Sequence, residues 1–283
     1  MSKITHQHNI ETRRIRFGIN FDLPKYWNQN CPVKTHMFNA VAMLAPAFER
    51  LAITSVLPYQ AQITDAVLKQ QVQGFIGQES SHGSEFIRMQ SVLKKQGYDP
   101  RQVEKKNVKR FVAFSSALSP EMHLSFTLAA EHVTAIISDL LLTDKQWLEN
   151  AEPKVAALWR WHAIEEIDHK AVVFDLYQSL GLGYWTRMKG MLRMTFVLNV
   201  FLMANYCHLA KKDGLLYKPS FWFKTLWILW GKPGFVRKQF WAYLSYFSPK
   251  FHPWKKNNHN LIEAFKRAFA RDPNLNVIDF LNK

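Results

Sequence analysis

The sequence predicts an all-α protein, and three observations support this fold class. Apolar residues recur at three- and four-residue spacing in several long segments, which is the periodicity of an amphipathic helix. No stretch alternates apolar and polar residues between hairpin turns, as the strands of an antiparallel sheet would. Hydrophobic residues make up 48% of the 283 residues, with only 11 Gly and 12 Pro. Disordered, collagen-like and low-complexity chains are therefore excluded, and a packed core is expected.

An irregular lead-in over residues 1–35 precedes the first two expected helices. The first helix is expected from about 35 to 58, where apolar residues recur at helical spacing, with a kink at Pro46. The second helix should run from about 60 to 96, because the following cluster 97–100 (Gly-Tyr-Asp-Pro) is a strong helix breaker.

Three further helices are expected along the rest of the chain. The third spans about 108–142 and is broken near Ser119-Pro120, since proline interrupts a helix. The fourth spans about 153–180 and ends at the Gly-Leu-Gly of residues 181–183. A long apolar or amphipathic helix then covers 184–210.

The chain divides into three expected parts: the lead-in 1–35, a four-helix bundle 36–182, and a helical extension 183–283 packed on the bundle. The extension is basic, with 17 Lys and Arg against 4 Asp and Glu, so it accounts for most of the net charge of +15. It is also aromatic-rich, because 22 of the 40 Phe, Trp and Tyr residues lie in it. Its surface should attract anionic partners.

Two Glu-x-x-His sequences are the clearest chemical signal: Glu79 with His82, and Glu166 with His169. At this spacing both side chains leave the same face of a helix, so a carboxylate and an imidazole can converge on one metal ion. A chain of this length contains about one such pair by chance. A single pair would therefore mean little.

Two further carboxylates make the pattern specific. Glu49 lies in an apolar stretch of the first expected helix and Glu131 in one of the third. Taken alone, each is as easily explained as a buried carboxylate that pairs with Arg50 or a histidine as it is as a metal ligand. Two helices with a single Glu and two with Glu-x-x-His, however, form the ligand set of ferritin-like di-iron and di-manganese carboxylate proteins. The predicted fold is thus a ferritin-like four-helix bundle with two metal ions.

A third histidine, His162, lies four residues before Glu166 and shares its helix face. It is expected to bind one of the metals, although a supporting role in the core remains open. The complete set of predicted ligands is Glu49, Glu79, His82, Glu131, His162, Glu166 and His169.

Several neighbours of these ligands receive other roles. Glu165 and Asp168 point about 100° away from the ligand face, so we expect them to face solvent or to hydrogen-bond a ligand. His123 and His132 are expected to be structural or to support a ligand. Asp139 either orients a ligand histidine or is a simple surface charge.

Two family resemblances rest on these residues. The sequence resembles the bacterial family catalogued as predicted metal-dependent hydrolases over most of residues 15–260. The segments that carry this resemblance run from FNAVAMLAPAFER through GFIGQESSHGSEF to WRWHAIEEIDHK. The seven ligand positions alone resemble the arylamine N-oxygenases of the ferritin-like superfamily, whose last helix contains the same His-x-x-x-Glu-x-x-His. The second resemblance implies iron and oxygen chemistry.

The expected function is a di-iron oxygenase or oxidase that uses O2 to hydroxylate, desaturate or N-oxygenate a small or lipid-like organic substrate. It would need an external electron donor or reductase, because no dinucleotide-binding Gly-rich loop is present. Manganese could replace iron. One alternative is a di-metal hydrolase, for which zinc is the expected ion. A second is a non-catalytic, metal-binding, membrane-associated protein.

Trp, Tyr and Lys are interleaved along the extension 183–283, a mixture that suits the headgroup layer of an anionic membrane. An aromatic core that closes one end of the bundle is the main alternative. Nucleic acid is not an expected partner, since no RNA-binding motif occurs. A membrane-bound enzyme could draw an apolar or amphiphilic substrate from the bilayer.

The two cysteines, Cys31 and Cys207, cannot form a disulfide framework and suit a reducing compartment. The longest apolar run, residues 194–204, is too short to span a bilayer. We therefore expect a cytoplasmic protein, peripheral on the inner face of the cell membrane, with a homodimer as one assembly to test. The glycines near Glu79 suggest either room beside the metals or close helix packing.

Overall fold

The computed structural model describes residues 9–100, 118–272 and 275–282, and in these ranges the chain is all-α, as predicted. No strand occurs there, and an isolated antiparallel bridge joins Asn28 to Ala151. The predicted start of the third helix at 108 lies outside the described residues. The helices are α1 (Pro32–Val56), α2 (Ala66–Lys95), α4 (Pro120–Thr143), α5 (Pro153–His169), α6 (Val172–Ser179), α7 (Tyr184–Lys212), α8 (Pro219–Trp230), α9 (Phe240–Ser245), α10 (Asn260–Arg271) and α11 (Val277–Leu281).

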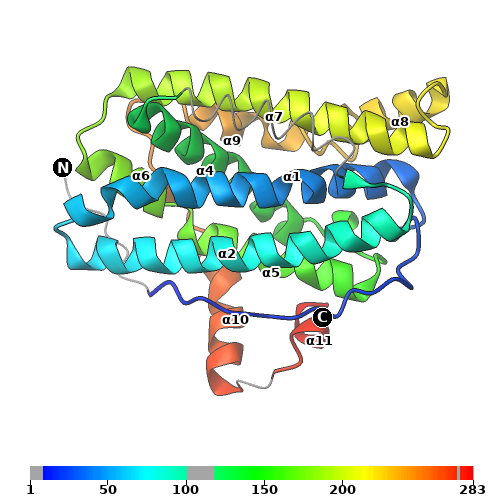
Figure 1. The fold of residues 1–283 in the computed structure, drawn as a ribbon, viewed down its shortest axis with the longest axis horizontal. Helices are drawn as coiled ribbons and strands as arrows, with labels where there is room; N and C mark the ends of the chain where they lie inside the picture. The colour runs from blue at the N-terminus through cyan, green and yellow to red at the C-terminus, as the bar shows by residue number, and fades with distance from the viewer. Residues whose placement is uncertain (1–8, 101–117, 273–274, 283) are drawn as a thin grey trace.

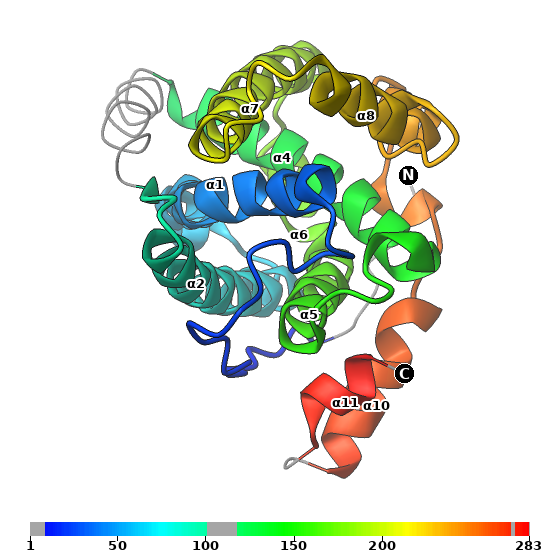
Figure 2. The ribbon, with the colours of Figure 1, turned by 90° about the vertical axis from the view of Figure 1, so that its right-hand side faces the viewer.

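Figure 1 shows α1, α2, α4 and α5 gathered into one group, with α7 lying along it. Within the group α1 packs on α2 and α4 packs on α5, while α7 contacts both α4 and α1. In the end-on view of Figure 2, α7 and α8 lie on one side of the group and α10 and α11 on the opposite side. The division of the chain at 36 and 183 stays a prediction.

Several helices begin at proline, which needs no backbone N–H at the first helical position. Pro32 opens α1, three residues before the predicted start, and Pro120 opens α4. The side chain of Ser119 caps α4 by accepting from a backbone N–H, and Glu152 caps α5 in the same way before Pro153. The predicted break at Ser119-Pro120 is therefore the beginning of a helix.

The second helix starts later than predicted, at Ala66 and not near 60. A short 3₁₀ helix, Leu57–Gln62, occupies the predicted first turn. The carboxylate of Asp65 then accepts hydrogen bonds from the backbone N–H groups of Val67 and Leu68 and fixes the true start.

Pro46 lies inside α1, yet the helix continues past it. A proline at this position removes the hydrogen bond to the carbonyl four residues earlier, which is that of Ala42. The side-chain amide of Gln90 on α2 donates to that carbonyl at 3.3 Å and to the carbonyl of Met43 at 3.0 Å. The neighbouring helix thus satisfies the carbonyl that Pro46, one turn before Glu49, leaves free.

The predicted fourth helix is interrupted, which corrects the expected span 153–180: α5 ends at His169, and α6 begins at Val172. Lys170, at the break, is buried and donates to the carbonyl of Lys256 at 2.8 Å and to Asn258 at 2.6 Å. A tertiary contact with a distant segment therefore coincides with the break, which local periodicity could not indicate.

Residues 9–31 of the lead-in contain no helix, as predicted, whereas 32–35 belong to α1; the lead-in is packed against the helices, since Phe17 is 0% and Trp27 is 3% exposed. Gly74 and Gly77 of α2 make room for it, because a side chain at either position would overlap Ile10 or Thr12. Close packing, and not an opening beside the predicted metals, is therefore what these two glycines provide.

Two segments, Pro32–Gln62 and Pro120–Thr143, are long and apolar enough to cross a membrane by length and composition. This differs from the expectation drawn from the longest apolar run, residues 194–204, which is too short to span a bilayer. Within the described residues, most of the apolar stretch of each segment is buried inside the protein, 56% in the first and 67% in the second, as in core helices. They are weak evidence for a membrane span.

Candidate metal centre

The structure brings all seven predicted ligands into one buried region between the helices, and none is more than 9% exposed. The residues are Glu49 on α1, Glu79 and His82 on α2, Glu131 on α4, and His162, Glu166 and His169 on α5. Their convergence is a structural fact, whereas their binding of a metal stays a prediction.

Six of the seven form two overlapping groups, in each of which one ligand atom per residue lies within 4.8 Å of the others. One group is Glu49, His82, His162 and Glu166, and the other is Glu79, Glu166 and His169. Glu166 belongs to both: its Oε1 faces His82 and His162, and its Oε2 faces His169. Such sharing is characteristic of dinuclear carboxylate centres.

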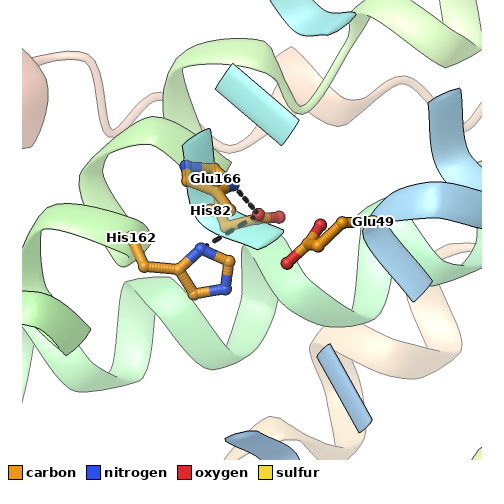
Figure 3. A group of neighbouring side chains, drawn as sticks. All are labelled: Glu49, His82, His162 and Glu166. Atoms are coloured by element: carbon orange, nitrogen blue, oxygen red, sulfur yellow. Dashed lines mark ion pairs between the residues drawn. The ribbon is translucent and has the colours of Figure 1, made fainter. Parts of the chain in front are cut away.

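In the first group the histidines converge on Glu166 (Figure 3). His162 Nδ1 lies 3.4 Å and His82 Nδ1 3.5 Å from Glu166 Oε1. The carboxylate of Glu49 points toward the same place from α1. Two carboxylates and two imidazoles thus surround one position.

In the second group the atoms gather around His169 Nε2. It lies 3.1 Å from Glu79 Oε1 and 3.6 Å from Glu166 Oε2. Glu131 lies outside both 4.8 Å groups, but its Oε2 is 3.3 Å from the same nitrogen, His169 Nε2. Three carboxylates and one imidazole therefore surround the second position.

Five of the facing atoms are buried and have no hydrogen-bond partner among the described residues, and an unsatisfied buried polar atom costs about 1–3 kcal/mol. They are Glu79 Oε1, His82 Nδ1, Glu131 Oε2, His162 Nδ1 and His169 Nε2. Metal ions between them would satisfy all five. The donor set therefore fits the predicted pair of divalent ions.

The outer nitrogen of His82 is held by Glu165, whose Oε2 lies 3.0 Å from His82 Nε2. An imidazole that donates from Nε2 keeps Nδ1 free for a metal. Glu165 in turn lies 3.6 Å from the guanidinium of Arg13, which is only 4% exposed. Arg13 of the lead-in thus supports the orientation of His82 through Glu165, a chain of contacts here called the relay.

His169 is oriented in the same way by Gln78. His169 Nδ1 lies 2.9 Å from Gln78 Oε1, and the amide of Gln78 donates to the backbone carbonyl of Glu11 at 3.1 Å. The donation from Nδ1 leaves His169 Nε2 free to face the carboxylates. Sequence reasoning missed Gln78 and Arg13, because neither belongs to a ligand motif.

Replacing Gln78 by leucine is expected to weaken Mn²⁺ binding about 10- to 100-fold, since loss of a histidine's outer partner typically has this effect. Chelator competition measures the affinity. Gln78→Glu, which keeps an acceptor at His169 Nδ1, should bind nearly as well as wild type. Gln70→Leu, an exposed change on the same helix, is the control. Equal affinities for Gln78→Leu and wild type would contradict the assigned role.

Burial acts to raise the pKa of each of the four carboxyl groups. It raises the pKa of Glu49 to about 8 and that of Glu131 to about 7. Burial and then the nearby charge of Glu49 raise the pKa of Glu79 well above its ordinary value. Burial acts in the same direction on Glu166, but the imidazoles of His162 and His169 outweigh it and lower the pKa of Glu166.

Burial also lowers the pKa of His82 and of His162 to about 3, so both imidazoles are neutral at pH 7 and can donate a lone pair. His169 differs: burial lowers its pKa, but the carboxylates of Glu166 and Glu131 raise it well above the ordinary value. A metal ion would therefore displace protons shared between His169 and the carboxylates.

Aromatic rings enclose the three histidines. Phe75 meets His169 edge-on at 4.9 Å between ring centres, Trp161 meets His82 at 4.9 Å, and Phe86 meets His162 at 5.0 Å. These rings limit the access of water, which strengthens the electrostatic interactions between the ligands.

Glu165 and Asp168 do not face solvent, which corrects one of the two roles expected for them. Glu165 is 0% exposed and takes the other role, as the partner of His82. Asp168 is 1% exposed and pairs with Lys266 of α10 at 2.6 Å. The lead-in and α10 cover the side of α5 that would otherwise meet water.

The remaining candidates are structural. His132 Nε2 lies 3.0 Å from the backbone carbonyl of Ala242, and His123 interacts with the backbone at Leu51. Asp139 neither orients a ligand histidine nor is a free surface charge, since it pairs with Lys256 at 2.5 Å and accepts from Asn258.

Four carboxylates and three imidazoles on an all-α scaffold define a protein with a candidate metal centre inside a group of helices. The chain belongs to the family described as predicted metal-dependent hydrolase, whose model matches residues 11–257 and so includes all seven candidate ligands. The resemblance expected from the sequence is thereby confirmed. No curated protein and no solved structure matches the chain.

Proposed function

We propose that the protein binds two iron ions through these seven residues and uses O2 to oxidise an apolar or amphiphilic small organic substrate by hydroxylation, desaturation or N-oxygenation. One observation supports this most: three carboxylates and three imidazoles form two groups that share Glu166, and a fourth carboxylate, that of Glu131, lies 3.3 Å from His169 Nε2. Carboxylate-rich helical sites with two Glu-x-x-His pairs typically bind redox-active iron or manganese. Such ions, when bound, supply the electrons that activate O2.

The residues of this chain have distinct roles in the proposal. Glu166 would be a ligand shared by both ions, with His82 and His162 as nitrogen ligands of one and His169 of the other. Glu165 and Gln78 keep the ligating nitrogens aimed at the ions. The surrounding aromatic rings keep water away from the reaction. An external electron donor would supply the electrons consumed in each turnover.

A second candidate is a metal-dependent hydrolase, which the description of the family favours. The same residues would then hold two zinc ions, whose chemistry is the activation of a water molecule for attack on an ester or phosphate.

Metal analysis combined with O2 uptake separates the two candidates. Protein purified from iron-supplemented cells is expected to contain about two iron ions per chain. After anaerobic reduction it should consume O2 in proportion to its iron. Zinc in place of iron, with hydrolysis of a nitrophenyl ester and no O2 uptake by iron-loaded protein, would instead establish the hydrolase. The absence of any metal from a folded protein would refute both.

A further inference from the structure

The large exposed apolar side chains of this protein are concentrated on α7, α8 and α9, in the basic part of the chain. On α7 they are Trp185, Leu192, Phe196, Val200 and Met203. On α8 they are Phe223, Leu226, Trp227 and Trp230, and on α9 they are Phe240, Trp241 and Leu244. Trp185, Phe196, Phe223 and Trp241 are each more than 70% exposed.

On α7 these side chains form a continuous line. Their spacings of three, four and seven residues place them on one side of the helix. The buried residues Met194 and Phe201 point the opposite way, into the core. The helix is thus apolar on two opposite sides, although only one of them is buried against other residues that the structure describes.

The same holds for α8, where the exposed residues at 223, 226, 227 and 230 share one side. The buried residues Phe221, Thr225 and Ile228 lie on the other side. Figures 1 and 2 both show α7 and α8 together along one edge of the molecule, outside the helices that contain the metal ligands. The two lines of side chains, here called the apolar face, therefore look away from the core.

Basic residues accompany the apolar face. Exposed cations on α7, α8 and the adjoining loops include Lys189, Arg193, Lys211, Lys212, Lys218, Lys224 and Lys232. From 184 to 260 the sequence contains one acidic residue, Asp213. Its side chain is only 2% exposed and is bound to Lys25 at 2.8 Å. No exposed carboxylate of the region therefore offsets its positive charge.

This charge distribution identifies the partner. A second copy of the chain on the apolar face would bring like charges together, which opposes association. A bilayer with anionic lipids offers an apolar interior under a negative surface. Tryptophan and phenylalanine bind at that boundary, while lysine and arginine reach the lipid phosphates.

We propose that the apolar face of α7 and α8 binds flat on the surface of an anionic lipid bilayer. Trp185, Phe196, Phe223 and Trp227 insert below the headgroups, and Lys189 and Lys224 contact lipid phosphates beside them. The proposal is independent of the chemistry at the metal centre, because none of these residues is a candidate ligand.

Vesicle flotation of the full chain tests the proposal, with phosphatidylglycerol and phosphatidylcholine in equal parts against phosphatidylcholine alone. We expect wild type to float with the anionic vesicles and far less with the neutral ones. Phe196→Ser/Trp227→Ser should lower the partition coefficient by about tenfold or more for each side chain. Phe21→Ser/Ile87→Ser is the matched control, because both residues are exposed but lie outside the apolar face.

Charge is tested separately with Lys189→Gln/Lys224→Gln, for which we expect about a 30-fold loss of binding to anionic vesicles at low salt. Lys69→Gln/Lys94→Gln removes two exposed charges from α2 and should bind as wild type does. Equal losses in test and control variants, or no flotation of wild type, would overturn the proposal. A dimer that Phe196→Ser/Trp227→Ser dissociates, without vesicle binding, would identify a second copy as the occupant.

Discussion

Glu166→Ala is expected to remove both metal ions together. Glu166 is the only residue that belongs to both groups of facing ligand atoms in the described structure, so its loss opens both positions at once. We expect the metal content to fall from about two ions per chain to well below one, since a dinuclear site depends on its shared carboxylate. Elemental analysis of the purified variant measures this.

Two comparisons sharpen the test. His162→Ala removes a ligand from one group alone and should leave about one ion in the other. Glu149→Ala removes an exposed carboxylate outside the site and should retain both ions. Full metal content in Glu166→Ala would show that Glu166 is not a bridge and would refute the dinuclear arrangement.

The metal-free protein is expected to lose about 2 kcal/mol or more of its free energy of unfolding between about pH 6.5 and 8.5. In this range the unfolded chain has already released the protons of its carboxyl groups and imidazoles. The folded chain retains them, because the pKa is raised to about 8 for Glu49 and to about 7 for Glu131, and is also raised for Glu79 and His169. Folding therefore takes up protons, and a rise in pH opposes it.

Lys170, whose pKa burial lowers to about 7, opposes this trend, but it is one group against the four whose pKa values are raised; the lowered pKa values of His82 and His162 do not change the sign. Their unfolded forms are neutral above about pH 6.5, so these two residues affect stability only at lower pH. Urea unfolding at three pH values, with a chelator present, gives the slope. Glu49→Gln/Glu79→Gln should flatten it. Saturating Mn²⁺ should reverse it, because metal binding releases these protons. A metal-free protein that is equally stable across the range would contradict the prediction.

The helical fold and the convergence of the ligands could be predicted because both follow from local periodicity. Three-residue spacing puts Glu79 beside His82, and Glu166 beside His169, on any regular helix. Glu49 and Glu131 join these pairs once their own helices, α1 and α4, pack against α2 and α5. Binding of iron, in contrast, is not settled by spacing and remains a prediction.

The groups around the ligands could not be predicted, because their contacts join distant parts of the chain. For Glu165 and Asp168 the sequence allows two roles, and exposure to solvent would require one side of their helix to be open. That side is covered by Arg13 of the lead-in and by Lys266 of α10. The break after His169 likewise depends on segment 256–258. No local pattern encodes such contacts.

The relay from Arg13 through Glu165 to His82 also bears on the order in which the protein is made. Arg13 leaves the ribosome early, but its partner Glu165 is synthesised about 150 residues later. Lys266, which pairs with Asp168, follows another hundred residues on. A nascent chain can thus contain all seven candidate ligands while Asp168 still lacks Lys266. The side of α5 that carries Glu165 and Asp168 is therefore covered only after Lys266 has been synthesised and α10 has packed against it.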